Sequence, residues 1–129
     1  MQFLKWLALA AGLTLAACGS SASEVADTPE QAVIVHFTYG STDLKLLFAL
    51  EDRLESVLAG TDVGEYDGNE IATDGSDGFL FLYGPDADLL FKTIEPVLRA
   101  TPFMQGAKVT KRYGPPEDGV KESDVVIES

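Results

Sequence analysis

The stretch that decides the fold is Asp74-Gly75-Ser76-Asp77-Gly78-Phe79-Leu80-Phe81-Leu82-Tyr83. Its first half is a dense turn signal of aspartate, glycine and serine. Its second half is an uninterrupted apolar and aromatic run, which is typical of a strand. The segment before the turn, Gly64-Glu65-Tyr66-Asp67-Gly68-Asn69-Glu70-Ile71-Ala72, is polar and contains glycine. We therefore expect a hairpin in which a polar strand precedes a strongly apolar one.

Upstream of this hairpin the sequence predicts a strand and then a helix. The β-branched and aromatic run at residues 33–39 is of strand length and ends at Gly40. Apolar residues then recur at helical spacing until Gly60, and Ser41 or Thr42 can cap the helix that they predict. The residues with this spacing are Leu44, Leu47, Leu50, Leu54, Val57 and Leu58.

Downstream of the hairpin the order is again helix and then strand. Asp86 is a good N-cap for a second helix, whose apolar residues extend to Leu98. Pro96 lies inside this pattern, so either the helix kinks there or a new turn begins with Pro96 in its first position. Residues 107–113 predict the last strand.

The resulting order, β-α-β-β-α-β, predicts an α+β fold of the ferredoxin-like type. We expect a four-stranded antiparallel sheet with both helices on one face and with the first and third strands in the centre. The second and fourth strands carry most of the charge, as edge strands do. One domain is expected over residues 32–116, followed by an acidic C-terminal tail at 117–129. Within that tail, residues 125–127 could add a short edge strand.

The N-terminal residues carry a targeting signal. Met1 and Lys5 form a small positive region, an apolar run follows to Leu15, and small residues precede Cys18. The stretch Leu15-Ala16-Ala17-Cys18 resembles the lipobox of bacterial prolipoproteins. This resemblance implies that residues 1–17 are a cleaved lipoprotein signal peptide and that Cys18 becomes a diacylated, membrane-anchored N-terminus. Residues 18–31 would then form a flexible linker.

The same resemblance implies a location in the cell envelope, on the outer membrane facing the periplasm if the organism has two membranes. Two other interpretations compete with it. A membrane-spanning helix needs about 20 consecutive apolar residues, and the apolar run at 3–18 is shorter and contains Lys5. The second alternative is an ordinary cleaved signal peptide beside which Cys18 has no function.

The charge of the chain narrows the class of partner. The formal net charge is −12, and loss of Lys5 with the signal peptide makes it −13. Phosphate backbones repel such a protein, so nucleic acid is not expected as a partner. Cys18 is the only cysteine, which excludes an internal disulfide. The alternative is that the acidic side chains only keep the surface solvated and the protein soluble.

One face of the predicted sheet is left without helices, and period-2 alternation indicates which side chains point to it. On this candidate binding face we expect Ile34, His36, Thr38, Lys108, Thr110 and Arg112. The second strand would add Glu65, Asp67 and Asn69 at the opposite side. A face with one basic and one acidic edge can recognise a protein or peptide. Charged edges that only prevent aggregation between strands are the alternative.

We expect no catalytic residue and no cofactor. His36 is the only histidine, and an enzyme would have to pair it with a carboxylate such as Glu65 or Asp67. Paired cysteines or histidines for zinc, a nucleophile elbow and a phosphate-binding loop do not occur in the sequence. The weak candidates for calcium are Asp67, Glu70, Asp74 and Asp77, whose spacing differs from that of an EF-hand.

The sequence therefore favours a non-enzymatic protein- or peptide-binding module, anchored to a membrane through Cys18. A small envelope enzyme and a weak calcium-binding domain are the alternatives. The segments 64–70, 83–88 and 112–116 resemble parts of small bacterial proteins of the same ferredoxin-like pattern. That resemblance transfers no functional residue.

Overall fold

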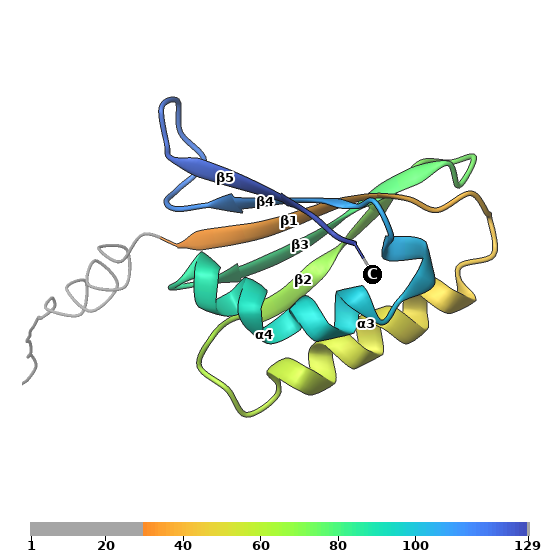
Figure 1. Ribbon diagram of the computed structural model, residues 1–129, viewed down its shortest axis with the longest axis horizontal. Coiled ribbons are helices and arrows are strands. Elements are labelled where there is room, and N and C mark those ends of the chain that lie inside the picture. The colour runs from red at the N-terminus through yellow and green to blue at the C-terminus, as the bar shows by residue number, and fades with distance from the viewer. Residues whose placement is uncertain (1–29, 129) are drawn as a thin grey trace, which may run out of the picture.

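The computed structural model describes residues 30–128, so the predicted signal peptide, Cys18 and most of the expected linker lie outside the described residues. In chain order the elements are β1 (Gln31–Thr38), α3 (Lys45–Leu58), β2 (Glu65–Ile71), β3 (Asp77–Gly84), α4 (Ala87–Arg99), a short 3-10 helix η2 (Pro102–Met104), β4 (Lys108–Arg112) and β5 (Glu122–Val126). The fold is α+β, with two α-helices and one antiparallel sheet (Figure 1).

The sheet has five strands in the order β2-β3-β1-β4-β5. The first and third strands are central, as the sequence predicts. Val35 in the middle of β1 lies opposite Leu80 of β3 on one side and opposite Val109 of β4 on the other. Because these three side chains share one face and all are fully buried, the register fixes which side of the sheet faces the core.

The prediction of four strands and a loose tail is wrong at the C-terminal end. β5 pairs with β4 from Lys108 opposite Val126 to Arg112 opposite Glu122, and the side chain of Ile127 is fully buried. Val125 and Ile127 alternate onto the core side, and this apolar pair holds an otherwise polar segment against the sheet. The folded unit therefore extends beyond residue 116, to Ile127.

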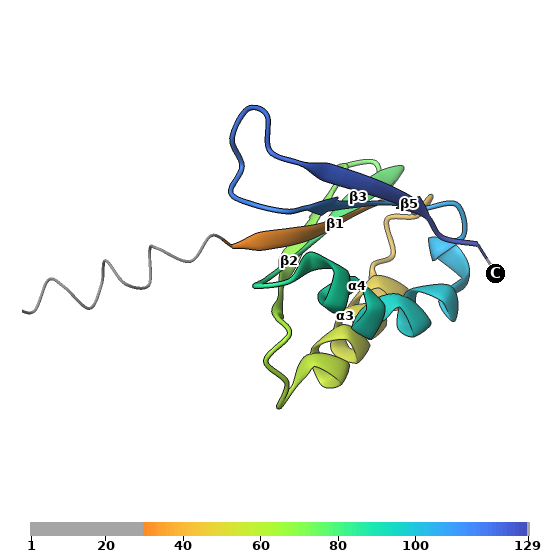
Figure 2. The same ribbon diagram turned by 60° about the vertical axis from the view of Figure 1, so that its left-hand side comes forward.

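Both α-helices lie on the same side of the sheet, and no helix of residues 30–128 lies on the opposite face (Figures 1 and 2). The core forms between the helices and the inward side chains of the central strands. Its strand members include Val33, Val35, Phe37, Leu80 and Leu82, and its helix members include Leu47, Leu50, Leu54, Leu90, Ile94 and Leu98. This arrangement leaves every second residue of β1 and β3 on the uncovered face, which we call the open face.

The helix ends match the sequence only in part. Asp86 is the N-cap of α4, where its Oδ1 accepts a hydrogen bond from the Leu89 amide at 3.1 Å. α4 continues through Pro96 to Arg99, so no new helix begins at the proline. α3 begins only at Lys45, without a side-chain cap, because the Ser41 hydroxyl accepts instead from the amide of Asp43 in a local turn.

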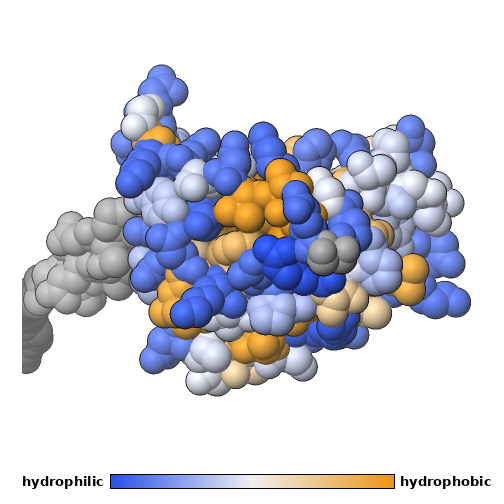
Figure 3. Space-filling view, in the orientation of Figure 1, coloured by the Kyte–Doolittle hydropathy of each residue, from blue (hydrophilic) through white to orange (hydrophobic). Residues whose placement is uncertain are grey.

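On the face shown in Figure 3 the described residues are mostly hydrophilic, with separate hydrophobic areas between them. Within residues 30–128, neither α3 nor α4 combines the length and the apolar character that a membrane crossing requires.

Candidate functional site

The open face is centred on β1 and β3. Ile34 lies opposite Phe81 of β3 and Thr110 of β4, and His36 lies opposite Phe79 and Lys108. His36 and Thr38 are exposed and Ile34 is partly exposed, so all three point away from the core, as alternation predicts.

Three aromatic rings stack across the two central strands and form what we call the aromatic strip: His36, Phe79 and Phe81. The rings of His36 and Phe79 lie 4.4 Å apart and within 10° of parallel. Phe79 and Phe81 follow along β3 with ring centroids 6.1 Å apart. Among residues 30–128 both α-helices lie on the other side of the sheet (Figure 2), and both phenylalanines are partly exposed. Alternation in the run 79–83 was a signal for them, because burial of Leu80 and Leu82 requires that Phe79 and Phe81 point outward.

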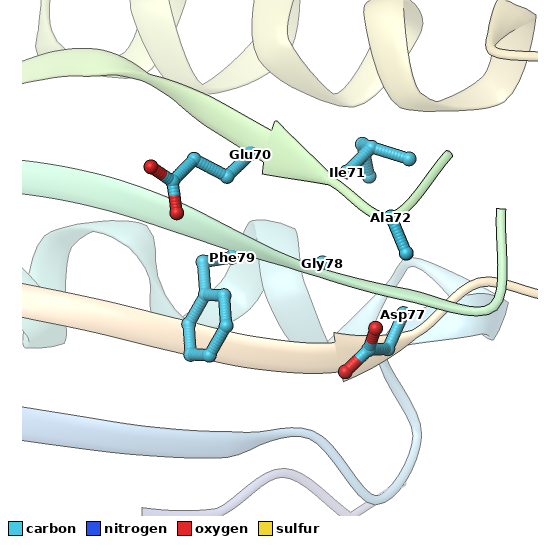
Figure 4. Close-up of a pocket in the computed structure, with 6 residues that line it drawn as sticks. All are labelled: Glu70, Ile71, Ala72, Asp77, Gly78 and Phe79. Atoms are coloured by element: carbon cyan, nitrogen blue, oxygen red, sulfur yellow. The ribbon is translucent and has the colours of Figure 1, made fainter. Parts of the chain in front are cut away.

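His36 has a carboxylate partner, but it is neither Glu65 nor Asp67. The Nε2 atom of His36 lies 2.8 Å from Oδ2 of Asp77, and both side chains are close to half exposed. Asp77 reaches His36 because it pairs with Thr38, two residues further along β1 on the same face. Figure 4 shows Asp77 and Phe79 extending from β3 toward β1.

A shallow depression of about 490 Å³ lies at this end of the open face, beside the β2–β3 turn (Figure 4). Its lining residues are Glu70, Ile71, Ala72, Asp77, Gly78 and Phe79. Glu70 of β2 lies directly opposite Phe79 of β3, and Asp77 is hydrogen-bonded to His36. The depression therefore combines two carboxylates with one aromatic side chain.

A β-bulge in β2 overturns part of the predicted acidic edge. Glu65 pairs with Tyr83 and Tyr66 with Leu82, but the next paired residue is Gly68, so the register shifts at Asp67. Every later residue of β2 is thereby turned over, since successive side chains alternate between faces. Asn69 consequently lies on the helix side of the sheet. Glu70 occupies the position on the open face that was expected for Asn69.

On the helix side of β2, Asn69 and the Tyr66 hydroxyl both donate hydrogen bonds to Oε2 of Glu51 in α3. Burial and the neighbouring Glu51 raise the pKa of the Tyr66 phenol well above its ordinary value. Tyr66 therefore stays protonated as a donor, and this group has a structural role in joining α3 to β2.

The predicted basic edge is also altered, because β5 lies beyond β4. Arg112 is on the open face by register, but it is only 9% exposed and its Nε donates to the carbonyl of Gly114 at 2.7 Å. Thr110 donates to Oδ1 of Asp124 in β5 at 3.0 Å, and the Lys108 ammonium lies 4.0 Å from the same carboxylate. Of the two predicted basic residues, only Lys108 is exposed there.

Carboxylates therefore bound the open face on both sides. We call these two groups the acidic rims: Glu65 and Glu70 on β2, and Glu122 and Asp124 on β5. All four side chains are exposed. Their ladder partners, Tyr83, Phe79, Arg112 and Thr110, place them on the same side of the sheet as the aromatic strip.

The remaining lysine of the last predicted strand, Lys111, faces the helices. Its ammonium lies 2.9 Å from Asp88 of α4, to which the Tyr113 hydroxyl also donates at 2.7 Å. These two contacts hold the pKa of Asp88 below its usual value, with the Tyr113 hydrogen bond as the larger cause. Lys111 is thus used to join α4 to β4.

The four weak candidates for calcium do not form one site, although Glu70 and Asp77 line the same depression. Within residues 30–128, no three histidine, cysteine, aspartate or glutamate side chains converge as metal ligands would. Hydrogen bonds from the Ser76 side chain and from the Ser76 amide, the latter at 3.0 Å, lower the pKa of the Asp74 carboxyl. Asp74 therefore acts as a turn residue.

Comparison of the chain with protein-family models, curated proteins and solved structures found no match. The class of ligand is therefore inferred from the side chains of the open face. The partly exposed rings offer an apolar contact area, and the carboxylates on either side attract positive charge. Such a surface can hold a positively charged group that also has an apolar part.

Proposed function

We propose that this chain is a lipid-anchored envelope protein that binds, without catalysis, a positively charged segment of a partner protein on its open face. The observation that carries the proposal is the aromatic strip, whose stacked rings are uncovered and bounded by the two acidic rims. Aromatic side chains supply large contact area at low entropic cost, which is why they dominate binding energies at interfaces.

The electrostatics favour a cationic partner. The chain carries 21 acidic against 9 basic residues, so its field attracts basic segments over a distance and accelerates encounter. At contact, each lysine or arginine that pairs with an exposed carboxylate of the rims contributes about 0.2–1 kcal/mol, and the apolar parts of the segment pack on the rings. The same charges disfavour nucleic acid and anionic lipid as ligands of this face.

In this proposal His36 is a contact residue and not an acid–base group. Its Nε2 atom is engaged by Asp77, and one face of its ring is covered by Phe79. These contacts fix the imidazole as part of the aromatic strip. In this proposal Asp77 orients the ring, and the exposed part of the ring contributes to the contact surface.

The proposed architecture is a ferredoxin-like domain with one added strand. Up to β4, the element order and the strand order β2-β3-β1-β4 match that pattern. β5 then widens the open face by one strand and adds the second acidic rim.

Anchoring through Cys18 is tested by substitution Cys18→Ser in the full chain. Two acyl chains give stable membrane attachment, because burial of each CH₂ contributes about 0.8 kcal/mol. We expect the wild-type protein to fractionate with membranes and the variant to be released or left unprocessed. Mass spectrometry of the membrane form should show the lipid mass on Cys18. Membrane retention of a Cys18→Ser variant from which residues 1–17 have been cleaved, or an unmodified Cys18 in the wild-type protein, would refute the anchor.

Binding on the open face is tested with synthetic peptides of leucine and lysine, and with counterparts in which glutamate replaces lysine. Fluorescence anisotropy at low salt should show binding of the lysine peptides alone. We expect Phe81→Ala to weaken that binding about tenfold, which corresponds to about 1.4 kcal/mol.

The matched control for Phe81→Ala is Leu46→Ala, which removes an exposed apolar side chain from α3, on the other side of the sheet. Its affinity should equal that of the wild type. The proposal fails if the lysine peptides do not bind or if the glutamate peptides bind equally well. It also fails if Phe81→Ala and Leu46→Ala change the affinity for the lysine peptides by the same factor. The far-ultraviolet circular dichroism of both variants verifies that they are folded.

A further inference from the structure

We infer that the segment bound on the open face is an amphipathic helix lying along β1 and β3, with its apolar stripe on the aromatic strip and its lysines or arginines over the acidic rims. This inference rests on the proposed function and specifies the conformation and charge pattern of the partner. It follows from where backbone hydrogen bonds and carboxylates are placed.

Backbone hydrogen bonding decides between a helix and an extended segment. The centre of the open face presents side chains alone, because the amides and carbonyls of β1 and β3 are used in ladders on both sides. An extended peptide lying there would cover its own amides and carbonyls with aromatic rings and leave them without partners. A helix satisfies those groups internally and presents only side chains. An extended peptide would find backbone partners at the sheet edges, outside the aromatic strip.

The width of the face fits one helix. Adjacent strands lie about 4.8 Å apart, and β1 is the middle strand of the five, so a helix centred over β1 has β2 and β5 each about 10 Å to the side. A helix with its side chains is about 10–12 Å across, so its flanks end about 4–5 Å short of each rim strand. The exposed glutamate and aspartate side chains of the rims cover the remaining distance to lysine or arginine side chains on the flanks, while the apolar stripe stays on the rings.

The length of the apolar surface agrees with this geometry. From Phe79 to Tyr83 the partly exposed side chains of β3 extend over about 13 Å, which corresponds to between two and three helical turns. Apolar residues spaced as i, i+4 and i+7 on the partner cover that distance.

The experiment compares two peptides of identical leucine and lysine composition, each of about 18 residues or five helical turns. One peptide has leucines at helical spacing and the other alternates leucine with lysine, as a strand does. Binding to the mature chain is measured by anisotropy, and the bound conformation by circular dichroism. We expect the helical pattern to bind at least about tenfold more tightly and to become helical on binding.

Charge variants test the placement over both rims. Glu70→Gln on β2 and Glu122→Gln on β5 should each weaken the helical peptide about threefold, as expected for partly exposed ion pairs. Asp52→Asn removes the same charge from the exposed surface of α3 and serves as the matched control, with no expected change.

The outcomes separate this inference from the proposed function. If the alternating peptide binds as tightly as the helical one and both depend on Phe81, the helix is refuted while the open face remains the binding site. If only the alternating peptide binds and Phe81→Ala has no effect, the segment pairs with a sheet edge, and both proposals fail. Equal loss from Asp52→Asn and Glu70→Gln would refute the placement over the rims.

Discussion

Gly75→Ala is expected to lower the free energy of unfolding by about 3 kcal/mol, because two independent costs meet at this residue. Gly75 lies in the β2–β3 turn with φ of +75°, a conformation that alanine adopts only with strain. An added Cβ would also lie 2.0 Å from the carbonyl oxygen of Ser41. That oxygen belongs to the backbone, so the clash cannot be relieved by rotation of a side chain.

The close approach has a reason in the fold. The Gly75 carbonyl accepts hydrogen bonds from the amides of Gly40 and Ser41, at 2.7 and 3.1 Å, and so joins the β2–β3 turn to the loop after β1. Asp77, the partner of His36, follows two residues later. We therefore expect Gly75→Ala to disturb the His36–Asp77 contact as well as the stability.

Gly40→Ala provides the matched control for this prediction. Gly40 also has a positive φ, of +81°, but a Cβ there meets nothing within 4 Å. The cost should be about 1 kcal/mol, from backbone strain alone. Urea denaturation of both variants measures the difference. Equal destabilisation would mean that the turn does not pack against Ser41 as described.

The central part of the fold could be predicted from the sequence because β1 and β3 have neighbours on both sides. Such strands read as the apolar runs at residues 33–39 and 79–83, and alternation along the first run indicated the outward direction of Ile34 and His36. β5 is a different case, since its residues Glu122–Val126 are mostly polar. Such a segment becomes a strand because β4 offers a free edge, and that edge exists only in the folded sheet.

The site was less predictable, since its details depend on register. The bulge at Asp67 turned Asn69 to the helix side, and nothing in a glycine-containing polar strand fixes the position of a bulge. The His36–Asp77 contact joins neighbouring strands diagonally, so it requires the pairing of Thr38 with Asp77 to be known. Arg112 was expected on a binding edge, but the Gly114 carbonyl in the chain after β4 engages it.

Ile127→Ala is expected to lower the free energy of unfolding by about 3 kcal/mol, the usual cost of removing a fully buried aliphatic side chain. The amide of Ile127 donates to the Ala107 carbonyl at 2.9 Å, and its own carbonyl accepts from Gly106 at 2.8 Å. Both bonds are made by the backbone, so alanine retains them. The loss therefore measures the contribution of the side chain to the core.

Val126→Ala is the control for Ile127→Ala, because the adjacent side chain is 49% exposed on the open face and should cost no more than about 0.5 kcal/mol. A tail loosely attached to the domain would give two small, equal effects. A fifth strand gives a large effect at Ile127 alone, because only every second residue of a strand reaches the core. The alternating result would also support the second acidic rim, since the same register that buries Ile127 places Glu122 and Asp124 on the open face. The contrast between neighbouring substitutions, measured by urea denaturation, thus tests the fold and the geometry of the proposed binding surface together.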